Sequence, residues 1–221
     1  MSAIDAVLFD FGSTLFAHEP LAVTVHDACR RLGTQVSMVW AEGLAGRIEA
    51  AAHTDSELLH PRDLDAEVWS TRWRVLYAAA DQEVTGLGAA VFAAMHDPHE
   101  WTAYAATALV LHELADAGVR VGVVSNTGWD IRTVFRAHSL DHLVHTFVLS
   151  YEVGAVKPAV EIFQAACRRL EARPEQTLMV GDDPVADAGA VRAGLRTLLL
   201  PALAPGAANG VDAVARIVRA D

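Results

Sequence analysis

Hydrophobic residues follow two patterns along most of the chain: short continuous runs, and longer stretches with an apolar residue every three or four positions. Continuous runs bounded by turn residues are typical of buried strands, whereas the three-to-four spacing is typical of helices. The runs predict strands at residues 6–9, 119–124, 146–149, 177–180 and 197–200. The spaced stretches predict helices at residues 104–117, 131–138, 159–170, 185–193 and 211–218. Strands that alternate with helices form a parallel sheet covered on both faces, so we predict an α/β fold with a Rossmann-like core.

The alternation is interrupted once, directly after the first strand. Between about residue 20 and residue 96 only helical spacing occurs, at residues 21–32, 36–52, 64–80 and 87–95. Gly33, the pair His60-Pro61 and Gly86 separate these segments, and such residues mark turns and boundaries. The pattern therefore predicts an α-helical cap domain of residues 17–98, inserted into a core made of residues 1–16 and 99–221.

Length and composition restrict the class of protein. A chain of 221 residues, 52% hydrophobic and 20% charged, suits one globular domain that carries an insertion. The apolar stretches are too short to cross a bilayer, and no secretory signal pattern begins the sequence. The two cysteines lack the spacing of metal ligands. We expect a cytoplasmic protein with no membrane partner; the sequence does not determine its oligomeric state.

The charge balance argues against a nucleic-acid partner. The chain has 28 acidic and 17 basic residues, a formal net charge of −11, and a negative surface repels phosphate backbones. Only one basic residue is a lysine, Lys157. Lysine offers a compact point charge that arginine cannot supply, and the position of Lys157 favours such a role.

Polar residues follow four of the predicted strands. The first strand runs into Asp10 and the segment Phe11-Gly12-Ser13-Thr14, and the second ends at Ser125-Asn126-Thr127-Gly128. Lys157-Pro158 follows the third strand, and the fourth runs into Gly181-Asp182-Asp183-Pro184-Val185-Ala186-Asp187. Ligands of open α/β sheets bind outside the carboxyl ends of the strands, so these segments are expected at one site.

In this order, the four segments resemble motifs I to IV of the haloacid dehalogenase-like hydrolases, and the helical insertion matches that family's cap in position. The resemblance implies that Asp10 is a nucleophile that forms an aspartyl-phosphate intermediate. It also implies that the Ser125 hydroxyl binds the transferred phosphoryl group, and that Lys157 offsets negative charge beside it. We expect Asn126 and Trp129 to complete the substrate-binding surface.

The same resemblance implies a magnesium site. Mg²⁺ prefers oxygen ligands, and the family pattern assigns Asp10, the backbone carbonyl of Gly12 and Asp182 to it. Asp183 and Asp187 are expected beside the metal, where they orient waters and the lysine. Three like charges at one strand end are costly unless a cation neutralises them. The expected activity is Mg²⁺-dependent hydrolysis of a small phosphorylated metabolite.

Gly12 is the main departure from the family pattern. Family phosphatases usually have a second aspartate there, which protonates the leaving alcohol and then activates water. Its loss is expected to slow turnover, since general acid–base help is typically worth about 10²–10⁴-fold. His18 is a candidate substitute, against the alternative of a solvated turn residue. Two other functions stay open: a 2-haloacid dehalogenase-like hydrolase, because Ser125-Asn126 resembles the dehalogenase motif, and a non-catalytic binding module.

The cap segment offers less specific candidates. Trp69, Trp73 and Tyr77 form a stripe at helical spacing, typical of packing within the cap, although its edge can also close over a substrate. Arg72 and Arg74 on the same helix are expected in solvent, with substrate contact as the alternative. Which cap side chains point inward, and hence which substrate is chosen, does not follow from the sequence.

Overall fold

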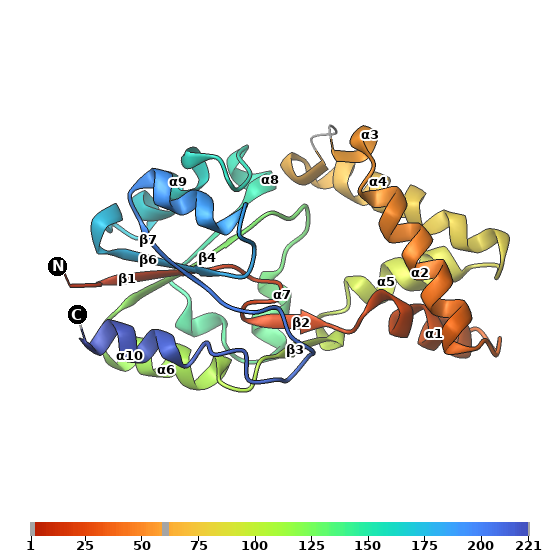
Figure 1. Ribbon diagram of the computed structural model, residues 1–221, viewed down its shortest axis with the longest axis horizontal. Coiled ribbons are helices and arrows are strands. Elements are labelled where there is room, and N and C mark those ends of the chain that lie inside the picture. Colours follow the sequence, from red (N-terminus) through yellow and green to blue (C-terminus); the bar gives the residue numbers. More distant parts are fainter. Residues whose placement is uncertain (1–2, 59–61, 221) are drawn as a thin grey trace.

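The computed structural model describes residues 3–58 and 62–220 and contains a five-stranded sheet in the order β5-β4-β1-β6-β7 (Figure 1). The strands are β1 Ala6–Phe9, β4 Arg120–Ser125, β5 Thr146–Leu149, β6 Thr177–Gly181 and β7 Arg196–Leu199. All four pairings are parallel. The predicted Rossmann-like α/β fold is therefore confirmed.

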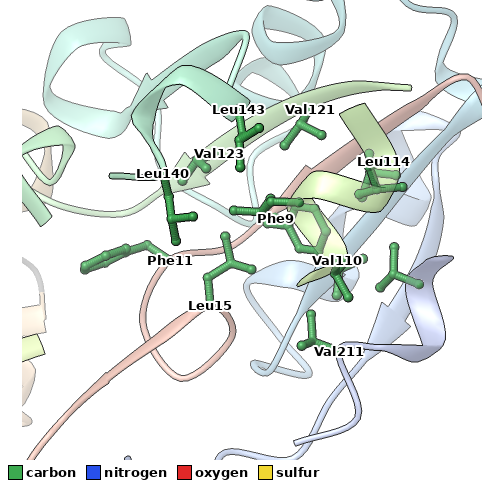
Figure 2. Close-up of a cluster of buried hydrophobic side chains, with 14 of the residues drawn as sticks. Phe9, Phe11, Leu15, Val110, Leu114, Val121, Val123, Leu140, Leu143 and Val211 are labelled. Carbon is green, nitrogen blue, oxygen red and sulfur yellow. The ribbon is translucent and has the colours of Figure 1, made fainter. Parts of the chain in front are cut away.

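Helices cover both faces of the sheet (Figure 1). The core helices are α6 Thr107–Asp116, α7 Arg132–Ala137, α8 Ser150–Val153, α9 Val160–Arg169 and α10 Ala213–Ala220. Val7 and Phe9 of β1 pack with α6, α7 and α10 on one face, as Figure 2 shows around Phe9. Ala6 and Leu8 pack with α9 on the other face. Burial on both faces explains why β1 reads as a continuous apolar run.

The helical insertion has a hydrophobic cluster of its own, built from α1, α2, α4 and α5. Its helices are α1 Leu21–Arg31, α2 Met38–Ala52, α3 Asp55–Leu58, α4 Ala66–Ala78 and α5 Leu87–Met95. Short 3₁₀ turns occur at η1 Arg62–Leu64 and η2 Ala79–Gln82. Ser37 and Asp65 accept hydrogen bonds from the first backbone N–H groups of α2 and α4, which fixes where these helices begin. The break predicted at His60-Pro61 lies outside the described residues.

A two-stranded antiparallel ribbon joins the insertion to the core, and the sequence pattern gave no sign of it. Strand β2 spans Phe16–His18 and strand β3 spans Trp101–Ala103, with Phe16 opposite Ala103 and His18 opposite Trp101. The chain therefore leaves the core and returns to it through neighbouring, hydrogen-bonded strands (Figure 1).

One predicted α-helix has a different form. The segment expected as a helix at 185–193 is a 3₁₀ helix, η6, of residues Asp187–Ala193. It packs closely against the segment after Lys157: a Cβ at Gly189 would lie 2.5 Å from Cβ of Pro158. Among the described residues, no helix has the length and apolar character needed to cross a membrane.

Candidate active site

The carboxyl ends of the strands converge on one cavity of about 410 Å³, lined from both the sheet and the insertion. From the sheet side it is lined by Asp10 after β1, Ser125 at the end of β4, Lys157 after α8 and Asp182 after β6. Trp129 lies at the same cavity, with its ring centroid 6.2 Å from that of Trp101. The sequence motifs therefore come together in space as the parallel topology requires.

Lys157 is the buried centre of this edge, with 6% of its surface exposed. Its Nζ donates hydrogen bonds to Asp10 and, at 2.7 Å, to Oδ1 of Asp187. Burial alone would lower the pKa of the lysine, but the two carboxylates raise it above its ordinary value. The ammonium is thus held in its charged form, and its predicted proximity to Asp10 is confirmed.

Asp187 and Asn126 hold this arrangement in place. The second carboxylate oxygen of Asp187 accepts the backbone N–H groups of Asp182 and Asp183, both at 3.0 Å. The side chain of Asn126 accepts the backbone N–H of Lys157 at 2.7 Å and donates to its carbonyl at 2.9 Å. Asn126 also lines the cavity, and its predicted contact with the substrate stays a prediction.

Three carboxylates crowd beside the lysine. Oxygens of Asp10, Asp182 and Asp187 all lie within 4.8 Å of one another. Burial and the neighbouring carboxylates raise the pKa of Asp10 to about 6, although Lys157 lowers it. Burial and the charge of Asp187 also raise the pKa of Asp182. A divalent cation bound by oxygen would favour the ionised forms, so the donor set fits Mg²⁺.

The acidic residues are not equivalent as ligands. Both oxygens of Asp187 are engaged in hydrogen bonds, which leaves Asp10 and Asp182 as the carboxylates available to a metal. Thr14 donates to Asp182 at 3.4 Å. Asp183 is exposed, and its Oδ1 accepts the N–H groups of Val185 and Ala186 at 2.7 and 2.8 Å. Asp183 therefore shapes the turn after β6.

Gly12 has room for a side chain. Its backbone does not adopt a positive φ, and the nearest atom to a Cβ built there is Cζ3 of Trp101 at 3.9 Å. Steric exclusion therefore does not account for glycine at this position. His18, the candidate substitute, is not among the residues that line the cavity; its ring nitrogens lie 2.9 Å from the Glu19 carbonyl and 3.3 Å from that of Ala94.

The insertion forms the opposite wall. Among the described residues, it contributes seven to the lining, which are Arg62, Asp63, Trp69, Trp73, Tyr77, Met95 and His96. The wall is in contact with the core: a Cβ at Gly128 would lie 2.2 Å from Cβ of Trp69, so the glycine allows the indole to sit directly on the loop after β4. The hydroxyl of Ser150 also donates to the backbone carbonyl of Asp63, at 2.5 Å.

The aromatic stripe and the arginines separate in the structure. Trp69, Trp73 and Tyr77 pack in the insertion's cluster, which confirms the packing interpretation, and they also line the cavity. Closure of this stripe over a substrate stays a prediction. Arg72 forms an ion pair with Glu57, and the guanidinium of Arg74 lies 3.9 Å from the ring centroid of Phe92. Neither of these two lines the cavity.

Sequence reasoning missed Arg62, which does line the cavity. Its guanidinium carbon lies 4.6 Å from the ring centroid of Trp73. It stands in a short 3₁₀ turn next to a helix break, so no periodic pattern gives its direction. His96 was missed as well: it caps the C-terminal end of α5 and also lines the cavity.

The sequence matches known hydrolases along most of its length. A family model described as "haloacid dehalogenase-like hydrolase" matches residues 4–194. The chain is 31% identical to a glyceraldehyde 3-phosphate phosphatase of Methanopyrus kandleri, over 88% of this chain and 83% of that protein. It is 28% identical to a ribulose-1,5-bisphosphate 5-phosphatase of Halopiger xanaduensis, over 98% and 93%.

Other matches are shorter. An uncharacterised hydrolase of Schizosaccharomyces pombe is 38% identical, but the match covers 33% of this chain and 34% of that one. A glyceraldehyde 3-phosphate phosphatase of Methanothermobacter thermautotrophicus is 35% identical over 42% of each chain. These two alignments span less than half of the relatives' length.

Solved structures share the fold. A phosphatase from Thermococcus onnurineus superimposes with a TM-score of 0.61, 23% identity and coverage of 89% of this chain and 86% of that chain. A dehalogenase superimposes with a TM-score of 0.70, 22% identity and coverage of 97% and 96%. Phosphatases and dehalogenases therefore share this architecture, and the architecture alone does not separate the two reactions.

Proposed function

Because the chain belongs to the haloacid dehalogenase-like hydrolase family, we propose that it is a Mg²⁺-dependent phosphatase that acts on a small phosphorylated metabolite. One observation carries the proposal: a buried lysine bridges Asp10 and Asp187 beside a third carboxylate, Asp182. Crowded, poorly solvated carboxylates need positive charge beyond one ammonium when an anionic phosphate joins them.

Each residue of the sheet edge has a part in this reaction. An oxygen of Asp10 forms a bond to phosphorus while the bond to the ester oxygen breaks; the leaving oxygen takes a proton from water and departs as an alcohol, and an aspartyl-phosphate remains. Water then adds to phosphorus, the bond to Asp10 breaks, and inorganic phosphate is released. Lys157 and the Ser125 hydroxyl hold the transferred group, and Asp187 and Asn126 fix the lysine.

Asp10, the carbonyl of Gly12 and Asp182 would hold the metal, with Asp183 and Asp187 around them. When bound, Mg²⁺ supplies positive charge that lets an anionic nucleophile meet an anionic phosphate. Gly12 offers no proton to the leaving group, so substrates whose leaving group is stable as an anion are expected to react best.

We further propose that residues 17–98 act as a cap over the core formed by residues 1–16 and 99–221. Support comes from the cavity itself, whose far wall belongs to the insertion. The full-length relatives are named as phosphatases of glyceraldehyde 3-phosphate and of ribulose 1,5-bisphosphate, both small phosphorylated compounds. This similarity supports a substrate of the same size class.

The test is a screen of phosphate esters, measured as phosphate release with Mg²⁺ and after chelation. We expect turnover that disappears with EDTA, returns with Mg²⁺, and is absent in Asp10→Asn. The matched control is Asp116→Asn, the same change at an exposed residue of the core, which should leave turnover unaltered.

Two outcomes would contradict the proposal. Metal-independent halide release from a 2-haloacid would establish the dehalogenase reaction instead. Binding of a phosphorylated ligand with no turnover of any ester would indicate a binding module.

A further inference from the structure

Hydrogen-bonding atoms without partners are concentrated on the insertion's side of the cavity. Among the described residues, seven buried side-chain polar atoms have no hydrogen-bond partner, and four of these belong to Arg62, Trp73 and His96. All three residues line the cavity opposite the strand ends. Buried polar groups in folded proteins are almost always paired, and leaving a donor unpaired is costly. Their gathering on one wall therefore points to a ligand that completes them.

Arg62 contributes two of the four atoms, Nε and Nη1. Its side chain is 16% exposed, and the closest carboxylate oxygen of Asp63 lies 3.7 Å from Nε, beyond hydrogen-bond distance. One face of the guanidinium is covered by the ring of Trp73. A planar cation held in this way retains unused donors, and charged N–H donors suit an anion such as a carboxylate or a phosphate.

The indole Nε1–H of Trp73 is a further donor without a partner. Nε2 of His96 is different in kind. Nδ1 of that ring lies 2.5 Å from the carbonyl of Phe92 and donates to it, which makes Nε2 an acceptor in the neutral ring. The unused donors on this wall are thus those of Arg62 and Trp73, and donors call for an acceptor.

We propose that Arg62 and Trp73 form a subsite for a second anionic group, a carboxylate or a phosphate, on the organic part of the substrate. The proposal rests on the proposed function, because the phosphoryl group to be transferred occupies the other end of the cavity. The preferred substrate is then a phosphate ester with an anionic group at its far end. Arg62 and Trp73 act as specificity-determining residues.

Asp63 is the competitor for the guanidinium. Its carboxylate forms a long ion pair with Arg62, at 3.7 Å from Nε, and burial raises the pKa of Asp63 although the arginine lowers it. An anionic group of the substrate would take over the guanidinium from this loose partner. Removal of the Asp63 charge should therefore strengthen the subsite, the opposite of removing Arg62.

The experiment compares matched substrates in the full-length protein with Mg²⁺. Glycerol 3-phosphate has one anionic group, 3-phosphoglycerate adds a carboxylate, and 1,3-propanediol bisphosphate adds a phosphate. We expect kcat/KM to favour one or both of the latter. In Arg62→Met this preference should fall by about ten- to a hundredfold, since a hydrogen bond to a charged group has that value.

Further variants distinguish the subsite from a structural effect. Asp63→Asn should raise the preference, and Trp73→Phe, which keeps the ring and removes the donor, should lower it less than Arg62→Met does. The control is Arg47→Met, the same change at an exposed cap arginine paired with Glu83, with the preference unaltered. Circular dichroism establishes folding; if Arg62→Met does not fold, Arg62→Lys, which keeps the charge and loses the planar fork, replaces it.

Calorimetric binding of 3-phosphoglycerate and glycerol 3-phosphate separates this proposal from the preceding one. Turnover with an unchanged preference in the Arg62 and Asp63 variants would overturn the subsite and leave the phosphatase intact. Conversely, no turnover of any ester, but tighter binding of 3-phosphoglycerate that depends on Arg62, would support the subsite and overturn the phosphatase. Equal binding of both ligands, independent of Arg62, would overturn the subsite whatever the activity.

Discussion

The two walls of the cavity differ in whether their polar side chains have hydrogen-bond partners. At the sheet edge the charged side chain of Lys157 is bound at once by Asp10 and Asp187, and even its backbone is held by Asn126. On the wall formed by the insertion, Arg62 and Trp73 line the same cavity and leave donors unpaired. One wall is complete without a ligand, and the other is not.

The difference is what we expect if the sheet edge carries out catalysis and the wall of the insertion selects the substrate. A nucleophile and its counter-charge must be in place before the substrate arrives, because rearrangement during reaction would cost rate. Groups that choose a substrate gain specificity when the wrong ligand leaves them unpaired. The predictions below test whether the two walls divide the work in this way, in order of decreasing effect.

Replacement of the lysine should have the largest effect. Lys157→Met leaves the buried Asp10 and Asp187 without their cation, and loss of one partner of a buried ion pair typically costs about 3–5 kcal/mol of stability. We also expect phosphate release to fall by about a thousandfold or more. Urea unfolding and a phosphate assay measure the two effects. Arg136→Met, at an exposed core cation, is the control, and similar losses there would remove the special status of Lys157.

Gly12→Asp should increase activity. The structure has space for a Cβ at this position, with Cζ3 of Trp101 as its nearest neighbour at 3.9 Å. A carboxylic acid there can protonate the leaving alcohol, so we expect turnover of alkyl phosphates to rise by about 10²-fold and that of aryl phosphates much less. Gly12→Asn is the control, with similar size and no acid. If a folded Gly12→Asp enzyme is no faster on either substrate type, another group already transfers the proton.

Mg²⁺ should bind at the sheet edge and stabilise the protein, and this stabilisation should not depend on residues of the opposite wall. At a hundredfold excess over the dissociation constant, a ligand adds about 2.7 kcal/mol, which for a chain of this size raises Tm by roughly 5–10 °C. Asp182→Asn should lose most of this shift, because it removes an available metal ligand. Arg62→Met should retain it. Equal shifts in both variants, measured by differential scanning calorimetry, would mean that Mg²⁺ binds elsewhere.

The contact between the walls should give the smallest effect. Gly128→Ala places a Cβ 2.2 Å from Cβ of Trp69, so the indole or the loop must move, at a cost of about 1–3 kcal/mol. We expect KM to rise severalfold more than kcat falls. Trp69→Gly in the same chain removes both that Cβ and the indole, so the double variant should be less impaired than the two single losses added together. Additive losses would show that the two residues act independently.

The residues at the sheet edge were predictable because parallel topology brings the carboxyl ends of the strands together. Strands that are parallel and adjacent must end side by side, so Asp10, Ser125 and Asp182 could be assigned to one place from the sequence. Lys157 follows the short helix α8, and its assignment came from the resemblance to the family motif. The fold follows from the same alternation of runs and spaced stretches. The close approach of Gly189 to Pro158 was not predictable, because the two residues are distant in sequence.

The wall formed by the insertion could not be predicted for a related reason. Periodicity placed Trp69 and Trp73 on one helix face, but not the direction of that face relative to the core. Arg72 and Arg74 share the helix with them and lie elsewhere, whereas Arg62, from a turn without periodicity, reaches the cavity. Such directions depend on how the insertion packs against the core, and no local pattern encodes that contact.

The β2–β3 ribbon has a consequence for chain entropy. Closing a loop costs conformational freedom that grows only with the logarithm of its length. Here the ends of the insertion are already fastened to each other by the antiparallel pairing of Phe16–His18 with Trp101–Ala103. The inserted segment is therefore a loop that the ribbon already closes where it joins the core. Its length and composition can vary at little thermodynamic cost to the sheet. A fold of this kind can exchange the whole inserted segment while the five parallel strands stay as they are.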